Sequence, residues 1–263
     1  VLPGDVAFKL HDTFGFPIDL TVEIAGTAGH DVDMDGFTAC MEDQKARARA
    51  NAKGDAWGSF NDVWVELSDK VAATEFDGYD NDIIEGAKVV AIVRNGESVE
   101  SAAAGEDVEV VLDRTPFYAE MGGQVADHGY LTSGTANLKV NQVKKTPKGF
   151  YVHTCTLLDG TIRVGDTVTA AVDEQRRASI CRNHTATHLM QKALREVLGE
   201  HVHQAGSYQD DRITHFDFTH FSAVSPAELA EVERRVNEKI YEALPVTVKN
   251  LPIEEAKKMG AMA

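Results

Sequence analysis

A pair of histidines four residues apart carries the clearest chemical signal in this sequence. His184 and His188 lie in the stretch RNHTATHLMQKALREVLG, whose apolar residues recur at helical spacing. Side chains at positions i and i+4 share one helix face, with Cβ atoms roughly 5–6 Å apart, a spacing that a divalent metal can bridge. Two imidazoles make half of a tetrahedral zinc site. The alternative is that both histidines are core or capping residues.

The residues around this pair supply no obvious third ligand. Position 185 is threonine, so the metalloprotease arrangement H-E-x-x-H is absent. Cys181 precedes His184 by three residues, but positions 181, 184 and 188 of one helix do not all reach a single tetrahedral zinc, so we do not expect Cys181 to be a ligand. His201 and His203 share one side if their segment is extended. A metal role and a surface strand end are both open for them.

A glycine pair marks a second candidate site in FYAEMGGQVADHG, residues 117–129. Gly122 and Gly123 allow positive φ angles and a close approach of the backbone to a ligand. The alternative is a wide hairpin loop between two strands.

The composition is that of a soluble globular protein. The chain has 263 residues, of which 43% are hydrophobic and 26% charged, enough for two or three domains. It has no apolar run near the roughly 20 residues that span a bilayer and no secretory signal. The three cysteines contain no C-x-x-C motif, which predicts free thiols in a reducing compartment and a cytoplasmic location.

The formal net charge of −16 weighs against a nucleic-acid partner. Binding depends on local patches rather than on the sum, however. The run KARARANAK at 45–53 brings Lys45, Arg47 and Arg49 close together without an intervening acid. This run is either a solvated helix face or a set of phosphate contacts.

The order of the expected elements predicts an α+β protein. Residues 1–77 are expected to be helical, with Asp19 or Thr21 as the N-cap of a helix that ends near Gly26 or Gly29. Residues 78–172 are Val-rich and alternating, with NG, SG, PKG and DG turns, which predicts a small antiparallel β-barrel or a sandwich. Residues 173–263 are expected to form an α/β core with a long helix, a strand, a second helix opened by Ser225 and a closing strand in LPVTVKN.

Five motifs together resemble the middle of a bacterial alanyl-tRNA synthetase. They are FKLHDTFGFPIDLT, PFYAEMGGQVADHG, RNHTATHLM, HVHQAGSY and FDFTH, in this order and at these separations. The resemblance covers the whole chain, from the end of the tRNA-recognition part into the editing domain. It implies an internal fragment of an alanine–tRNA ligase, with an α/β editing core of the threonyl/alanyl-tRNA synthetase second-domain type, truncated at its C-terminus. ATP and Mg would serve only the full-length enzyme.

The resemblance also assigns roles to residues of the second half. Editing domains of this family hydrolyse the ester of mischarged Ser-tRNA(Ala) or Gly-tRNA(Ala), because one methyl or hydroxyl group is worth only about 1–3 kcal/mol in a binding pocket. His184 and His188 would bind zinc, and Gln204 would act in the editing pocket. The loop Gly122–Gln124 would approach the 3′ end of the tRNA. Whether zinc activates water or holds the substrate stays open.

The family completes its zinc site with a Cys-x-x-x-His segment, which this sequence lacks. The resemblance therefore places the other two ligands beyond residue 263. We expect the fragment to bind zinc weakly or not at all, and to edit poorly.

Asp12, in LHDTFG, matches a family position that reads the G·U wobble pair of the acceptor stem. A carboxylate can accept from the guanine 2-amino group in the minor groove. Without the resemblance, Asp12 would be interpreted as an N-cap ahead of Thr13 and Phe14. The expected partner is tRNA(Ala), and the basic run at 45–53 becomes a candidate for phosphate contacts. No membrane partner and no oligomeric state are indicated.

Two other functions compete with this interpretation. A freestanding trans-editing hydrolase would share the barrel and the HTATH helix, but would not need residues 1–75 and would carry its own Cys-x-x-x-His. A non-enzymatic RNA-binding module would use the histidines only for structure. Deacylation of mischarged tRNA(Ala) distinguishes an enzyme from a module.

Overall fold

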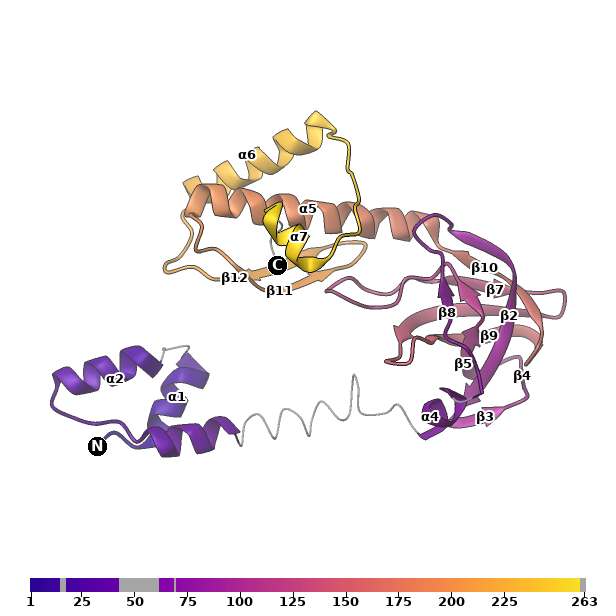
Figure 1. Ribbon diagram of the computed structural model, residues 1–263, viewed down its shortest axis with the longest axis horizontal. Helices are drawn as coiled ribbons and strands as arrows, with labels where there is room; N and C mark the ends of the chain where they lie inside the picture. The colour runs from indigo at the N-terminus through magenta and orange to yellow at the C-terminus, as the bar shows by residue number, and fades with distance from the viewer. Residues whose placement is uncertain (15–17, 43–61, 69, 261–263) are drawn as a thin grey trace. The chain divides into compact units, whose positions relative to one another are not determined.

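The computed structural model describes residues 1–14, 18–42, 62–68 and 70–260 (Figure 1). The chain divides into two units, Val1–Glu66 and Leu67–Ala263, and each is described by itself.

The first unit is helical, as predicted. It contains α1 (Gly4–Phe14), α2 (Ile18–Thr27) and a helix over residues 34–42. Gly29, with φ 75°, follows the end of α2, as expected. The N-cap prediction for this helix was wrong, because α2 begins at Ile18 and includes both Asp19 and Thr21. Lys45, Arg47 and Arg49 lie outside the described residues.

The centre of the second unit is a closed antiparallel β-barrel, which confirms the barrel alternative. Its six strands pair in the order β10-β7-β8-β9-β5-β2, and β10 pairs with β2 to close the ring. They are β2 (Ile83–Arg94), β5 (Asp107–Leu112), β7 (Gly129–Thr132), β8 (Ala136–Lys145), β9 (Tyr151–Arg163) and β10 (Thr167–Val172).

Shorter elements surround the barrel. β3 (Glu97–Val99) pairs with β2 across the predicted Asn95-Gly96 turn, in which both residues have positive φ, as a two-residue type I′ hairpin requires. β4 (Ser101–Ala103) pairs with β9, and β1 (Glu75–Phe76) pairs in parallel with β6 (Arg114–Thr115). The helix α4 (Asp62–Ser68) spans the junction between the two units.

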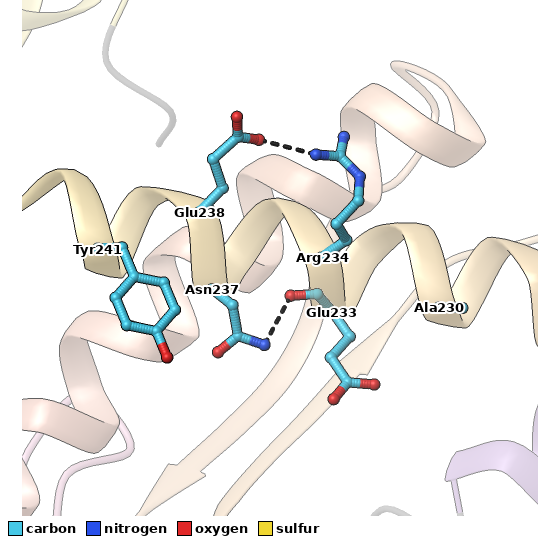
Figure 2. Close-up of a pocket in the computed structure, with 6 residues that line it drawn as sticks. All are labelled: Ala230, Glu233, Arg234, Asn237, Glu238 and Tyr241. Carbon is cyan, nitrogen blue, oxygen red and sulfur yellow. Dashed lines mark hydrogen bonds and ion pairs between the residues drawn. The ribbon is translucent and has the colours of Figure 1, made fainter.

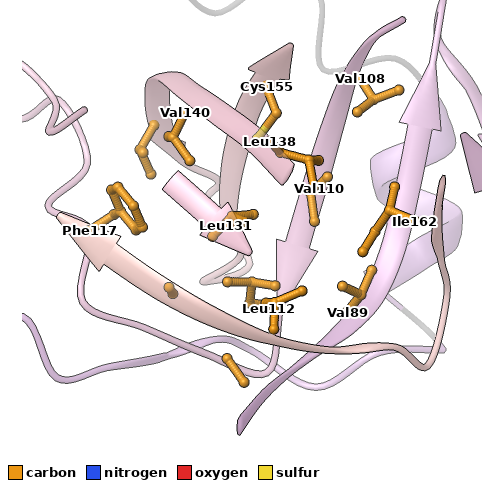
Figure 3. Packing of buried hydrophobic residues seen from close by; sticks show 14 of the residues in the cluster. Val89, Val108, Val110, Leu112, Phe117, Leu131, Leu138, Val140, Cys155 and Ile162 are labelled. Atoms are coloured by element: carbon orange, nitrogen blue, oxygen red, sulfur yellow. The ribbon is translucent and has the colours of Figure 1, made fainter. Parts of the chain in front are cut away.

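Alternating apolar residues fill the barrel (Figure 3). On β5, Val108, Val110 and Leu112 are buried, two positions apart, because successive side chains of a strand point to opposite faces. Phe117 and Cys155 complete the interior. This apolar core underlies the loops at the barrel rim.

The long helix α5 (Glu174–Leu198) follows the barrel, as predicted. It packs against the hairpin of β11 (Gln204–Gln209) and β12 (Thr214–Phe218), and also against α6 (Pro226–Glu242) (Figure 1). The side chain of Asp173 caps α5 by accepting from the backbone N of Arg176 at 3.0 Å. Ser225 opens α6 with a capping box, confirming the predicted helix start.

The closing strand predicted in LPVTVKN was wrong. Residues 244–252 form neither strand nor helix and are exposed, and the chain then continues into α7 (Ile253–Lys258). A β-strand needs a neighbour for its backbone N–H and C=O groups, and the described residues pair no strand with this segment. The fold is thus mixed α/β. No helix in the described part of the chain is both long and apolar enough to cross a bilayer.

Candidate functional site

The start of α5 is attached to the loop that carries the glycine pair. Arg177 donates from Nε to both carboxylate oxygens of Asp127, at 2.9 and 3.0 Å. Its two terminal nitrogens donate to the backbone carbonyls of Gly78, at 2.7 Å, and Pro116, at 2.8 Å. Asp127 is only 1% exposed and also accepts from the backbone N of Tyr118 at 2.7 Å. Bidentate arginine–carboxylate pairs fix orientation as well as distance, so the direction of α5 is set relative to the barrel rim.

His184 and His188 lie on one face of α5, as their spacing predicts. Their rings are stacked, with centroids 5.1 Å apart and planes inclined by 16°. His184 is half-buried and His188 is exposed. Burial, and to a smaller extent the charge of His188, lowers the pKa of His184 from its ordinary value of 6.5. Neutral imidazole, the form that binds metals or accepts protons, therefore predominates on His184 at neutral pH.

The glycine loop reaches this helix face. The Oε1 atom of Gln124 accepts a hydrogen bond from Nδ1 of His184 at 2.6 Å, across 60 residues of sequence. Gln124 is 7% exposed, so its side chain lies between the loop and the helix. The structure thus brings together three predicted site residues: Gln124, His184 and His188.

The backbone of the same loop lies along β11. Gln209 donates to the carbonyl of Gly123 at 2.8 Å, and Val125 donates to the carbonyl of Gln209 at 3.1 Å, so that Gln124 and Gln209 form a parallel bridge. Gly122 and Gly123 have φ angles of 63° and 83°. A Cβ atom on Gly123 would lie 2.6 Å from the carbonyl oxygen of Ser207. Glycine is required there both for the backbone angle and for the close approach.

Gln204 lies on the side of the hairpin that faces α5. β11 and β12 pair Gln204 with Phe218 and Ser207 with Phe216, and both phenylalanines pack against the α5 core. Residues directly opposite each other in an antiparallel ladder have their side chains on the same face of the sheet. Gln204 and Ser207 are three positions apart, which would put them on opposite faces, but the register shift between Gln204 and Gly206 places both on one face. Nε2 of Gln204 lies 3.5 Å from Oγ of Ser207. Gln204 is therefore linked to the glycine loop through Ser207.

Ser207, Asn183 and Thr187 are site residues that the sequence analysis missed. Asn183 donates from Nδ2 to the carbonyl of Asp210 at 2.7 Å, and its own carbonyl accepts from the hydroxyls of Thr187, at 2.9 Å, and Thr214, at 3.1 Å. These bonds attach the hairpin to α5 beside His184 and His188. Thr187 lies between the two histidines in sequence, but nothing local indicates that Asn183 and Thr214 would meet.

The remaining predicted residues lie elsewhere. Asp12 is in the last turn of α1, in the first unit, so the N-cap interpretation was wrong, and its side chain is not among those described. His201 hydrogen-bonds His220 at 2.9 Å between ring nitrogens, and its ring stacks on Phe221. His203 is exposed. In the described part of the chain, neither His201 nor His203 hydrogen-bonds or stacks with His184 or His188.

The donor set beside the two histidines is limited. Within the described residues, no group of three or more His, Cys, Asp or Glu side chains is arranged to hold a metal ion. His184 and His188 fit a metal as two adjacent imidazole donors. Because Nδ1 of His184 is bonded to Gln124, its Nε2 is the nitrogen left for a ligand.

A hollow of about 540 Å³ on α6 lies outside this site (Figure 2). Two of its polar side chains bond to neighbours on the same helix: Arg234 pairs with Glu238 at 3.0 Å, and Asn237 donates to the carbonyl of Glu233 at 3.0 Å. Exposed pairs along one helix are typical of a solvated surface.

Comparisons with known proteins agree with the motifs. The sequence model of the family described as tRNA synthetases class II (A) matches residues 1–176. The chain is 48% identical to an alanine–tRNA ligase of Acetivibrio thermocellus and 47% identical to one of Pelotomaculum thermopropionicum, over its whole length in both cases. An alanine–tRNA ligase of Rhizobium meliloti is 46% identical over 99% of the chain. The chain spans about 30% of the length of these relatives. The chain belongs to the family of class II tRNA synthetases (A).

Proposed function

We propose that this chain is part of an alanine–tRNA ligase and carries its editing site, which hydrolyses the ester of mischarged Ser-tRNA(Ala) and Gly-tRNA(Ala). One observation carries the proposal: Gln124 of the glycine loop hydrogen-bonds His184 of the histidine pair, at 2.6 Å. Two motifs that the sequence keeps 60 residues apart thereby become one surface, bordered on β11 by Gln204 and Ser207.

In this proposal each part of the surface has its own task. Gly123 packs against β11, whereas the space beside Gly122 is open, so the 3′ end of the tRNA can lie against the loop there. Gln204, exposed on the α5 side of β11, offers an amide that can donate and accept at the amino acid or its ester. Nε2 of His184 holds a lone pair beside the ring of His188, available to a metal ion or to a proton.

His184 and His188 would hold a zinc ion, completed by two ligands from a Cys-x-x-x-His segment that follows residue 263 in the longer protein. Bound zinc would supply Lewis-acid chemistry at the ester or at water. The chain's own contribution is the orientation of the two imidazoles on one rigid helix face, which the Arg177–Asp127 pair holds against the barrel rim.

Recognition of tRNA(Ala) belongs to the same proposal. Asp12, on α1, would accept from the acceptor stem, and Lys45, Arg47 and Arg49 would contact phosphates. A local arginine also lies beside the glycine loop: Arg176, which donates to the carbonyl of Ala126 at 2.7 Å. Local positive charge of this kind offsets the acidic net charge at the site of RNA contact.

The test compares hydrolysis and binding of three substrates, Ser-tRNA(Ala), Gly-tRNA(Ala) and Ala-tRNA(Ala), with zinc present. The 263-residue chain is measured beside a chain extended past Ala263 through the next Cys-x-x-x-His. We expect the extended chain to hydrolyse the two mischarged substrates and to spare Ala-tRNA(Ala), and the shorter chain to be slow. Binding of all three substrates without turnover in either form would identify an RNA-binding module and reject the editing function.

A further inference from the structure

We propose that Gln124 is a positioning residue that fixes the tautomer of His184, with the proton on Nδ1 and the free lone pair on Nε2. This inference rests on the proposed function for its purpose, but its geometry stands on the described residues alone. It adds a role for Gln124 that is separate from contact with the tRNA.

The hydrogen bond itself determines the tautomer. A carbonyl oxygen is an acceptor only, so the ring nitrogen 2.6 Å from Oε1 of Gln124 must carry a proton. A neutral imidazole has one N–H, so the proton on Nδ1 leaves Nε2 as the acceptor. The opposite tautomer would place two lone pairs face to face across the same distance.

Gln124 is held firmly enough to impose that choice. Its backbone N donates to the carbonyl of Met121 at 3.1 Å and its carbonyl accepts from the N of Met121 at 3.2 Å, which closes a tight turn. The flanking Gly123 and Val125 are bonded to Gln209 on β11. The side chain is nearly buried, so few rotamers are open to it. The amide is therefore in place before any ligand arrives.

His188 provides an internal reference. Its ring is stacked on that of His184, but within the described residues it has no hydrogen bond to a protein side chain. A change in Gln124 should therefore alter the tautomer of one histidine and leave its neighbour unaltered. Sites that ligate through imidazole depend on such outer partners, whose loss costs roughly 10–100-fold in metal affinity.

The test is long-range ¹H–¹⁵N NMR of the ¹⁵N-labelled 263-residue chain, treated with chelator and held at neutral pH. The His184 signals are assigned by their loss in His184→Ala. We expect the Nδ1–H tautomer at His184 in the unmodified chain and a shift toward Nε2–H in Gln124→Ala, with His188 unchanged. Gln124→Glu should keep a proton on Nδ1, because a carboxylate also only accepts.

Gln142→Ala is the matched control. It removes another glutamine amide of the barrel, one that donates to Glu120 at 3.2 Å, and should leave both histidines unchanged. The amide signals of Val125 and Gln209 report whether the loop stays on β11 in each variant. Gln124→Glu keeps the acceptor in place, so it remains decisive if Gln124→Ala releases the loop.

An Nε2–H tautomer at His184 in the unmodified chain would overturn the proposal, since it would mean that the amide of Gln124 donates instead of accepting. The same tautomer in the Gln124→Ala and unmodified chains would also overturn it. Cobalt(II) titration of the extended chain adds a second readout, with affinity expected to fall 10–100-fold in Gln124→Ala. If the tautomer behaves as expected but no form of the protein deacylates Ser-tRNA(Ala), the editing function fails while the positioning role stands.

Discussion

Arg177, in the first turn of α5, and Asp127, in the loop before β7, form a bidentate ion pair at the base of the candidate site. The Asp127 carboxylate is almost fully buried, and the Arg177 side chain is 13% exposed. The pair connects the loop that carries Gln124 with the helix that carries His184. Its integrity therefore determines whether the two halves of the site face each other.

Replacing Asp127 with Asn should destabilise the second unit by up to about 3–5 kcal/mol, because it removes the buried carboxylate partner of Arg177 and leaves only Asp82, 3.4 Å from Nη1, to offset the charge. Urea unfolding followed by circular dichroism measures the loss. Glu238→Gln is the control, since it breaks an exposed pair with Arg234 on α6 and should cost no more than about 0.5 kcal/mol. Equal effects of the two substitutions would show that the buried pair does not anchor α5.

Gly123→Ala should release the glycine loop from β11. An alanine at position 123 would have a positive φ, and its Cβ atom would lie 2.6 Å from the carbonyl oxygen of Ser207. An alanine at position 105 would have only the positive φ, 89°, because its Cβ atom would lie in open space. The backbone angle alone costs roughly 1–2 kcal/mol, so Gly105→Ala isolates that part. Hydrogen exchange at the amides of Val125 and Gln209 measures loop docking. It should accelerate in Gly123→Ala only, and unchanged exchange there would contradict the described packing.

The buried His153 should make the barrel sensitive to acid. Its Nε2 lies 2.7 Å from the hydroxyl of Thr115 and its Nδ1 lies 2.9 Å from the carbonyl of Val110, and burial lowers its pKa from 6.5 to about 4. Between these values the unfolded chain binds the proton more strongly, so stability falls as the pH drops from about 6.5 to 4. The loss attributable to this group is roughly 3 kcal/mol.

Comparison of His153→Gln with the unmodified chain isolates this contribution. The free energy of unfolding, measured from pH 7 to pH 4, should decline less steeply in His153→Gln. His215→Gln, at an exposed position of β12, should follow the unmodified curve. Parallel curves for all three proteins would show that His153 takes up its proton without unfolding.

Zinc content should distinguish the two lengths of chain. Two imidazoles leave half of the usual tetrahedron open, so we expect the dialysed 263-residue chain to retain far less than one zinc per chain. A chain extended through the next Cys-x-x-x-His should retain one, and should lose it on His184→Ala. One tightly held zinc in the shorter chain would mean that its ligands all lie within residues 1–263, which would contradict our assignment.

The local patterns of the sequence predicted the helices and strands better than they predicted the contacts between them. The alternation in β5 and the Asn95-Gly96 turn indicated strands, and Ser225 marked the start of α6, because these signals act within a few residues. The closing strand failed because an alternating segment forms a strand only if a neighbour pairs with it. Asp19 failed as a cap because α2 begins at Ile18, two residues before the start that a cap at Asp19 requires.

The candidate site shows the same difference between local patterns and long-range contacts. The spacing of His184 and His188 placed them on one helix face, and the glycine pair indicated a special backbone. The bond between Gln124 and His184 joins residues 60 positions apart, and the pair of Asp127 and Arg177 joins residues 50 apart. Local sequence contains no information on such pairings, so these contacts were found only in the folded structure.

The most direct test of the editing account is the rate of Ser-tRNA(Ala) hydrolysis by the zinc-loaded extended chain with one histidine removed. His215 is the matched control, because it alternates with Thr214 and Phe216, which face α5, and therefore points away from the site. We predict that His184→Ala lowers the rate at least about 100-fold, on the scale of a lost catalytic group, and that His215→Ala leaves it unchanged. Equal rates for His184→Ala and the unmodified chain would contradict the account, because hydrolysis would then not depend on the histidine pair.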